Sequence, residues 1–195
     1  MPLTVNNGTA LKPQDSPAPA EQNRIVNIPH RFQEGKLWCW AACMEMVLKH
    51  RGINDMSQCK IVQTMLKDEE PNHQCGPDFE SRDESCDPLK MAQTWRDCGI
   101  TQVDPDSRAL TMDEIKIEIA ANRPVQVGIF WHTNSGHSVL IKGWAPTLPE
   151  TLLIDDPLRD SPLNPDEDGS GRASYDDLVR AFGHGHWDLS WKRLQ

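Results

Sequence analysis

One stretch of sequence decides the fold of this 195-residue chain: Gln33-Glu34-Gly35-Lys36-Leu37-Trp38-Cys39-Trp40-Ala41-Ala42-Cys43. From Cys39 to about His50 apolar residues recur at helical spacing, so the pattern predicts a helix over residues 39–50. Cys39 begins this helix, where the positive end of the helix dipole favours a thiolate. Gln33, six residues earlier, carries an amide that could donate to an oxyanion. We therefore expect Cys39 to be a nucleophile, against the alternative of one more buried cysteine.

Length, charge and hydropathy limit what the chain can be. Its 195 residues fit one domain with a tail. The formal net charge of -9 comes without a long basic block, so we expect no nucleic-acid partner. The longest apolar-rich stretch, residues 125–131, is much shorter than the about twenty residues of a membrane span. We therefore expect no membrane segment.

The N-terminal residues differ in composition from the rest. Residues 1–24 are rich in small and polar residues and in proline, and they carry few large apolar side chains, so the folded part is expected to begin near residues 25–29. We expect a disordered tail or linker over 1–28 and one domain over 29–195. The first 24 residues have neither a basic leader nor an apolar core, so they are not typical of a secretory signal. The localisation stays open, and export would require a specialised secretion system.

Capping residues and hydrophobic patterns predict the other elements. Further helices are expected at 57–66, 88–99, 111–122 and 174–183, each beginning at a capping residue or a proline. Short stretches rich in branched and aromatic residues predict strands at 125–131, 138–144, 151–154 and 187–194. Because most helices precede the strands, we expect an α+β fold. An N-terminal helical lobe would pack against a C-terminal antiparallel sheet lobe, with a cleft between them.

A cysteine nucleophile needs a base, and His137 begins the expected strand over 138–144. His132, at the end of the preceding strand, is the rival. A carboxylate or an amide usually orients such an imidazole. Asp155 and Asp156 end the next strand, which would return beside that of His137 in an antiparallel meander. We expect Asp156 to orient the base, with Asp155 as a nearly equal alternative.

The chain resembles the papain-like cysteine proteases in four motifs: Gln33, Cys39-Trp40-Ala41-Ala42, Gly136-His137-Ser138-Val139 and Asp156-Pro157. It is most similar to the compact bacterial branch that includes the double-glycine leader peptidase domains of bacteriocin-exporting transporters. The resemblance implies a papain-like fold, with Cys39 as nucleophile and His137 as base and then acid. It also implies that Asp156 orients the base and that Gln33 donates to the oxyanion. The short separation of Cys39 and His137 departs from the larger enzymes and implies a shortened scaffold.

The same resemblance implies a cysteine endopeptidase that needs no cofactor or metal and cleaves a protein or peptide substrate after small residues such as Gly-Gly. We expect a secreted bacterial effector or toxin, whose producer would need a cognate inhibitor or immunity protein. Two alternatives stay open. An amidase, deamidase or acyl transferase shares the Cys-His-Asp order. A papain-like scaffold can also persist as a catalytically silent binding module.

The other cysteines have two interpretations. Six cysteines are too few to build a disulfide miniprotein of this size. With Cys39 set aside, two bridges can form, Cys43 with Cys59 between adjacent helices and Cys75 with Cys86 around a polar insertion. Free thiols are an equal alternative.

Four further groups are weaker candidates. His73 with its two nearest cysteines lacks the compact Cys-x-x-Cys pair of a zinc site, so we expect no metal. His184-Gly185-His186 is typical of a solvated turn, and the acidic run 166–168 of a solvated loop. Trp131 and Trp144 lie on apolar strands and are expected to pack in the core. Trp144 is also a candidate shield for the hydrogen bond between the base and its orienter.

Overall fold

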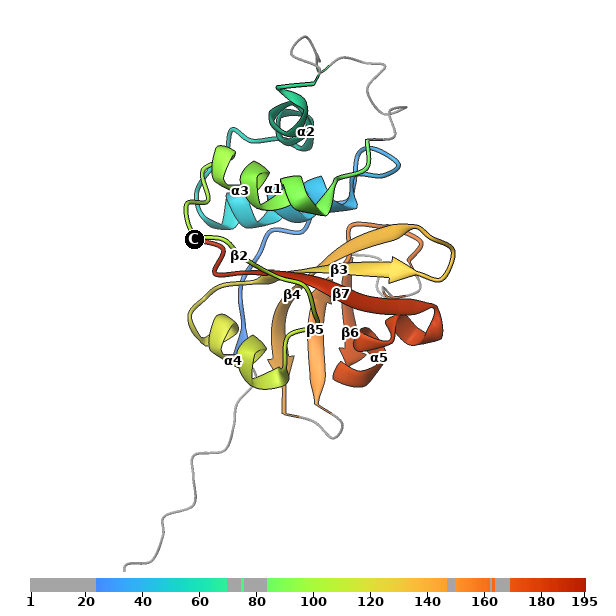
Figure 1. Ribbon diagram of the computed structural model, residues 1–195. Helices are drawn as coiled ribbons and strands as arrows, with labels where there is room; N and C mark the ends of the chain where they lie inside the picture. The colour runs from blue at the N-terminus through green and yellow to red at the C-terminus, as the bar shows by residue number, and fades with distance from the viewer. Residues whose placement is uncertain (1–23, 70–74, 76–83, 147–149, 162, 164–168) are drawn as a thin grey trace, which may run out of the picture.

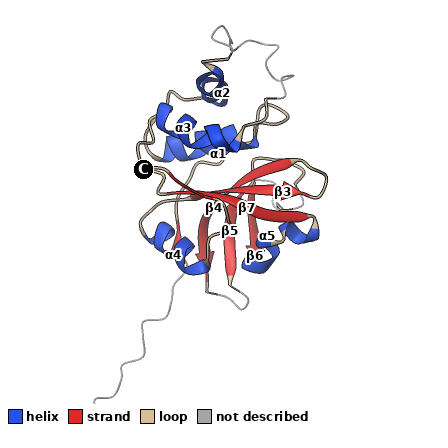
Figure 2. Cartoon of the chain, viewed as in Figure 1, coloured by secondary structure: helices blue, strands red, loops and turns tan. Residues whose placement is uncertain are grey.

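The computed structural model describes residues 24–69, 75, 84–146, 150–161, 163 and 169–195. Within these residues most helices lie apart from the strands, as the colours of Figure 2 show. Three helices gather above the sheet in Figure 1 and form the helical lobe: α1 (Cys39–His50), α2 (Gln58–Leu66) and α3 (Pro88–Asp97). The expected α+β class, with a helical lobe packed against an antiparallel sheet lobe, is confirmed.

The helices begin at the residues that the caps predict. Ser57 caps α2 by accepting a hydrogen bond from a backbone N–H of the first turn, and Pro88 occupies the first turn of α3. Thr111 and Glu114 form the complete capping box of α4 (Met112–Ala120), in which each side chain accepts from the other's backbone N–H. Local sequence therefore fixes where these helices start.

The sheet has seven antiparallel strands in the described part of the chain. They run in the order β2-β7-β3-β4-β5-β6, and β1 pairs with β4 beside this path. Their bounds are β1 (Arg24–Ile25), β2 (Asp104–Asp106), β3 (Val125–Trp131), β4 (Gly136–Ala145), β5 (Thr151–Asp155), β6 (Ser170–Ser174) and β7 (Gly185–Lys192). The expected meander of β3, β4 and β5 is confirmed, and it places the beginning of β4 beside the end of β5.

A buried polar network joins the helical lobe to the sheet. The Gln126 side chain of β3 accepts a hydrogen bond from Nε1 of Trp95 on α3 at 3.0 Å and donates to Oγ of Ser138 on β4 at 2.9 Å. The Cys43 thiol of α1 donates to the carbonyl oxygen of Ser138 at 3.4 Å. Since all four residues are buried and bonded to one another, the network fixes how α1 sits on β4.

The folded domain begins before residue 29. Residues 24–28, assigned to the tail from the sequence, include strand β1 and the buried side chains of Val26 and Ile28. These two apolar residues pack in the main core, and the backbone N–H of Val26 donates to Lys142 on β4 at 2.6 Å. These residues belong with the domain, at the early side of the range 25–29 where the sequence predicts that the folded part begins. The remaining residues of the predicted tail, 1–23, lie outside the described residues.

The C-terminal part contains two further differences from prediction. The helix expected over 174–183 is shorter, because α5 (Tyr175–Val179) gives way to a 3-10 turn η2 (Ala181–Gly183). Ala181 and Phe182 have φ angles of 43° and 54°, which no α-helix tolerates. Strand β6, with the sequence Ser-Gly-Arg-Ala-Ser, was not expected, because it lacks the branched and aromatic residues on which strand prediction depends.

The structure forms one disulfide among the described residues, between Cys59 and Cys75. Both predicted bridges are therefore wrong. Cys43 faces the sheet and donates to Ser138, so it cannot reach α2, and Cys86 remains a thiol. Cys39 and Cys98 are also free.

The described residues contain neither a membrane-spanning helix nor a cluster of metal ligands. No helix among them is both long and apolar enough to cross a bilayer. No group of three or more His, Cys, Asp or Glu side chains in the described ranges has the arrangement of a metal site. His73 and the acidic run 166–168, two of the weaker candidates, lie outside the described residues.

Candidate active site

Cys39 is the first residue of α1 and lines a cleft of about 510 Å³ between the helical lobe and the sheet. Its exposed fraction is 9%. The backbone N–H groups in the first turn of a helix have no partner within the helix, and the dipole is positive there. No acidic residue stands in that turn of α1 to oppose the dipole. The cleft end of α1 therefore offers both an electropositive setting for the sulfur and donors for a negatively charged oxygen.

His137 and Asp156 meet at the sheet side of this cleft. His137 is the second residue of β4, and Asp156 directly follows β5. His137 Nε2 lies 2.9 Å from Asp156 Oδ1, and the two side chains are 5% and 0% exposed. The same Oδ1 accepts the backbone N–H of Leu158 at 2.8 Å, which holds the carboxylate in a turn. Nδ1 of His137 is left for Cys39, whose side chain lies close enough to interact with the ring.

Asp155 has a different environment. Its Oδ1 lies 2.5 Å from Nζ of Lys142 and 3.6 Å from Nδ1 of His30. Lys142 also donates to Oγ of Ser170 at 2.9 Å. Asp155 is completely buried, so this ion pair neutralises a carboxylate that would otherwise be costly to bury. Of the two candidate orienters, Asp156 is thus the one beside His137.

The surroundings of His137 favour its protonated form. Burial lowers the pKa of His137, but its hydrogen bonds to Asp156 and Cys39 outweigh burial and raise the pKa from 6.5 to about 10. The imidazole is therefore charged at neutral pH. An imidazolium between a carboxylate and a sulfur is the state in which an adjacent cysteine is held as a thiolate.

Gln33 lines the same cleft but its amide is occupied. Nε2 donates to the carbonyl oxygens of Lys36 at 2.7 Å and Gly35 at 3.0 Å, while Oε1 is buried without a partner among the described residues. Gly35 has to be glycine, because a Cβ there would lie 2.5 Å from the ring of Trp38. To donate to an oxyanion, the Gln33 amide has to exchange one of these two carbonyls.

Trp131, expected in the core, instead lines the cleft and stacks on His137. The ring centroids are 6.0 Å apart and the ring planes differ by 20°. His137 pairs with Ile129 across β3 and β4, so Trp131 is its diagonal neighbour on the same face. The hairpin register could have indicated this. Trp144 lies near the other end of β4, where Nζ of Lys116 on α4 is 4.6 Å from the centroid of the Trp144 ring. The prediction that Trp144 shields the hydrogen bond between His137 and its orienter is therefore wrong.

His132, the alternative candidate for the base, does not lie beside Cys39. It is exposed, its ring centroid lies 6.2 Å from that of His186, and it does not line the cleft. His184 and His186 are exposed as well, and Nε2 of His186 lies 2.9 Å from a carboxylate oxygen of Asp188. These histidines belong to the outer surface where β3 ends and β7 begins.

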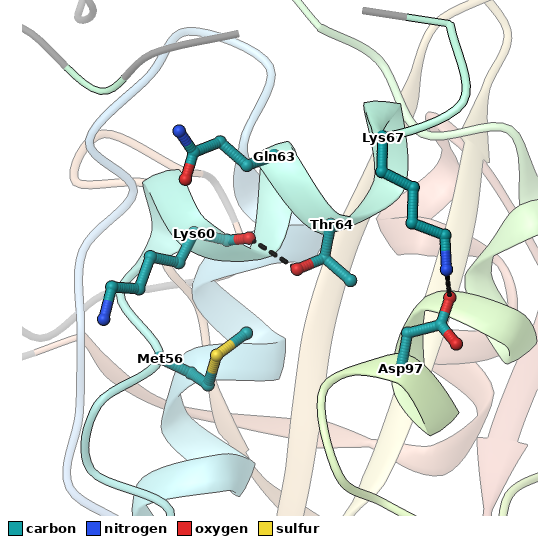
Figure 3. Close-up of a pocket in the computed structure, with 6 residues that line it drawn as sticks. All are labelled: Met56, Lys60, Gln63, Thr64, Lys67 and Asp97. Carbon is teal, nitrogen blue, oxygen red and sulfur yellow. Dashed lines mark hydrogen bonds and ion pairs between the residues drawn. The ribbon is translucent and has the colours of Figure 1, made fainter. Parts of the chain in front are cut away.

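The rest of the cleft is mostly apolar. Partly exposed apolar side chains form its rim, among them Leu37, Phe130 and Leu158. A second hollow of about 540 Å³ lies on α2 and the end of α3 (Figure 3). No cysteine or histidine lines it, and Lys67 and Asp97 pair there at 2.7 Å. Of these two hollows, the first is the one that has the components for acyl transfer by a cysteine.

A cysteine at a helix N-terminus beside a His-Asp pair, in the cleft of an α+β fold, is the arrangement of a cysteine peptidase. Residues 25–180 match the model of the Peptidase_C39 like family, and the chain belongs to this family. The expected papain-like cysteine peptidase is thereby confirmed. Among solved structures, the chain is similar to a double glycine motif protease from an AMS/PCAT transporter in complex with the leader peptide. Their identity is 19%, with a TM-score of 0.46, over 88% of this chain and 96% of that chain. No curated protein matches the chain.

Proposed function

We propose that this peptidase cleaves backbone peptide bonds with Cys39 as nucleophile, His137 as base and acid, Asp156 as orienter and Gln33 as oxyanion donor. The observation that supports the assignment most directly is that the buried imidazole of His137 is hydrogen-bonded to Asp156 through Nε2 and shares one cleft with Cys39. In such an arrangement the carboxylate fixes the tautomer and the orientation of the imidazole ring.

The reaction follows from the residue types. The Cys39 thiolate attacks the scissile carbonyl carbon, and the carbonyl oxygen becomes an oxyanion. The backbone N–H of Cys39 and the Gln33 amide, after exchanging one carbonyl partner, donate to that oxygen. His137 then protonates the leaving amine, and a thioester remains on Cys39. His137, now neutral, takes a proton from the water that attacks the thioester. Cys39 then leaves as the thiolate, which restores the pair of thiolate and imidazolium.

For the substrate we propose a peptide with small residues at the cut, such as Gly-Gly. Cys39 and His137 are only 9% and 7% exposed, so a bulky side chain at the scissile bond would meet the walls before the carbonyl reached the sulfur. The apolar rim, by contrast, suits larger side chains further along the peptide.

We also propose that the protein acts outside the cytoplasm, as a secreted effector or toxin with a cognate inhibitor. The disulfide between Cys59 and Cys75 supports this, because such bridges persist mainly in oxidising compartments.

A peptide library treated with the wild-type chain or with Cys39→Ala tests the function. Mass spectrometry should detect backbone cuts, enriched after small residues, with the wild-type chain alone. Side-chain mass changes of about one dalton, or crosslinks, would instead indicate a deamidase or acyl transferase. Binding of peptides without any turnover by the wild-type chain would indicate a binding module.

A further inference from the structure

The side chain of Gln58 forms hydrogen bonds to the backbone on both sides of Gln33, and we call this pair of bonds the clasp. Gln58 is the first residue of α2, and its side chain is completely buried. Nε2 donates to the carbonyl oxygen of Phe32 at 2.9 Å, and Oε1 accepts the backbone N–H of Glu34 at 2.9 Å. One primary amide thus satisfies the peptide groups immediately before and after Gln33, as a neighbouring strand would do.

The same amide is anchored to the helix of the nucleophile. The second N–H of Gln58 donates to Oε2 of Glu45 on α1 at 3.0 Å. Glu45 is 4% exposed, and its other oxygen lies 2.6 Å from Nζ of Lys49 one turn along α1. Gln58 therefore connects the backbone around Gln33 to the helix that begins at Cys39.

The opposite side of this loop is held by the sheet lobe. The backbone N–H of Gln33 donates to the carbonyl oxygen of Pro157 at 2.9 Å, directly after Asp156. Gln33 is thus fixed both to the residue that follows the orienter and, through Gln58, to the nucleophile helix. A displacement of about 1 Å in such a group can cost about 100-fold in rate.

We propose that Gln58 is a positioning residue that acts through Gln33. It holds the amide of Gln33 within reach of the oxyanion that forms on the carbonyl attacked by Cys39. The inference rests on the proposed role of Gln33 as oxyanion donor. Gln58 does not line the cleft, so its action on the reaction has to pass through other residues.

A double-mutant cycle on kcat tests this proposal with the full chain. Gln33→Ala should lower kcat about 100-fold, as removal of one oxyanion donor does. Gln58→Met keeps the volume but loses the clasp, and it should lower kcat by about 10- to 100-fold with little change in KM. If Gln58 acts through Gln33, the double variant should lie within about threefold of Gln33→Ala alone. If Gln58 instead had only a general structural role, the loss of kcat in the double variant would be the product of the losses in the two single variants.

Gln126→Met is the matched control, because Gln126 is also a completely buried glutamine with polar partners but does not touch residues 32–34. Its effect on kcat should be the same in the wild-type and Gln33→Ala backgrounds. If Gln58→Met does not fold, as judged by thermal melting, Gln58→Asn retains the amide on a shorter side chain and should follow the same cycle.

Two results would overturn the proposal: an unchanged kcat in the folded Gln58 variant, or losses that multiply. If Gln33→Ala itself leaves kcat unchanged, the donor role of Gln33 fails and this proposal with it. The proposed cysteine chemistry is judged separately, because Cys39→Ala should abolish turnover in every background.

Discussion

Asp156 and Asp155 are adjacent in sequence, but their carboxylates have opposite environments. Asp156 Oδ1 lies 2.9 Å from Nε2 of His137, while Asp155 Oδ1 lies 2.5 Å from Nζ of Lys142. Consecutive side chains at a strand end point to opposite faces, so one carboxylate is directed toward His137 and the other toward Lys142, and both are completely buried. This difference separates a chemical role from a structural one.

Replacing each carboxylate by its amide should distinguish these roles. Asp156→Asn should lower kcat/KM by at least about 100-fold, because the amide orients His137 less well and does not stabilise the imidazolium. Asp155→Asn should instead destabilise the fold by about 3–5 kcal/mol, because Lys142 loses its buried partner. Steady-state kinetics and thermal melting measure the two effects. Equal losses of activity per folded molecule would contradict the assignment of Asp156 as orienter.

The pH dependence of activity should reflect the raised pKa of His137. Its imidazolium persists up to a pKa of about 10, so kcat/KM should hold through the neutral range and fall as the pH rises through about 10. In Asp156→Asn the carboxylate that raises this pKa is gone, so the alkaline limb should move to lower pH. A pH–rate profile of both proteins checks the sign. An alkaline limb near 6.5 in the wild-type chain would show that the ring titrates as an isolated histidine.

Alkylation should single out Cys39 among the thiols. Burial raises the pKa of Cys43 well above its usual value and that of Cys86 and Cys98 to about 12, so all three are protonated at pH 7. Brief treatment with iodoacetamide at pH 7, followed by peptide mapping, should label Cys39 and abolish activity in parallel. Labelling of Cys86, the other free thiol that lines the cleft, at an equal rate would argue against an activated nucleophile.

The local elements could be predicted because their signals are local. The apolar period after Cys39, the capping box at Thr111 and the branched residues of 125–131 each act within a few residues, and each element formed as expected. Strand β6 and the strand pairing of residues 24–25 depend on partners distant in sequence, so composition did not indicate them.

The sequence motifs indicated most residues of the candidate site. The motifs named Cys39, His137 and Gln33, but the choice between Asp155 and Asp156 required the position where β5 ends, which sequence prediction leaves uncertain by a few residues. Gln58 gave no signal at all, because its role depends on α2 folding back onto residues 32–34.

The disulfide between Cys59 and Cys75 should stabilise the helical lobe. The bridge joins residues 16 positions apart, and closing a loop of that size restricts the unfolded chain by about 3 kcal/mol. For a chain of this size that corresponds to about 6–12 °C in the melting midpoint. Melting of the wild-type chain with and without reductant, compared with Cys59→Ala/Cys75→Ala, measures it.

The functional consequence of the bridge follows from its position. Cys59 stands next to Gln58 at the start of α2, so the bridge tethers the segment that clasps the Gln33 loop. Because the bridge stabilises the fold, reduction should lower the melting midpoint of the wild-type chain to that of Cys59→Ala/Cys75→Ala. Reductant should leave the midpoint of that double variant unchanged. At 25 °C, where both forms stay folded, kcat should remain within about threefold, because the hydrogen bonds of Gln58 are intact. A midpoint that does not respond to reductant would mean that the bridge does not form in solution.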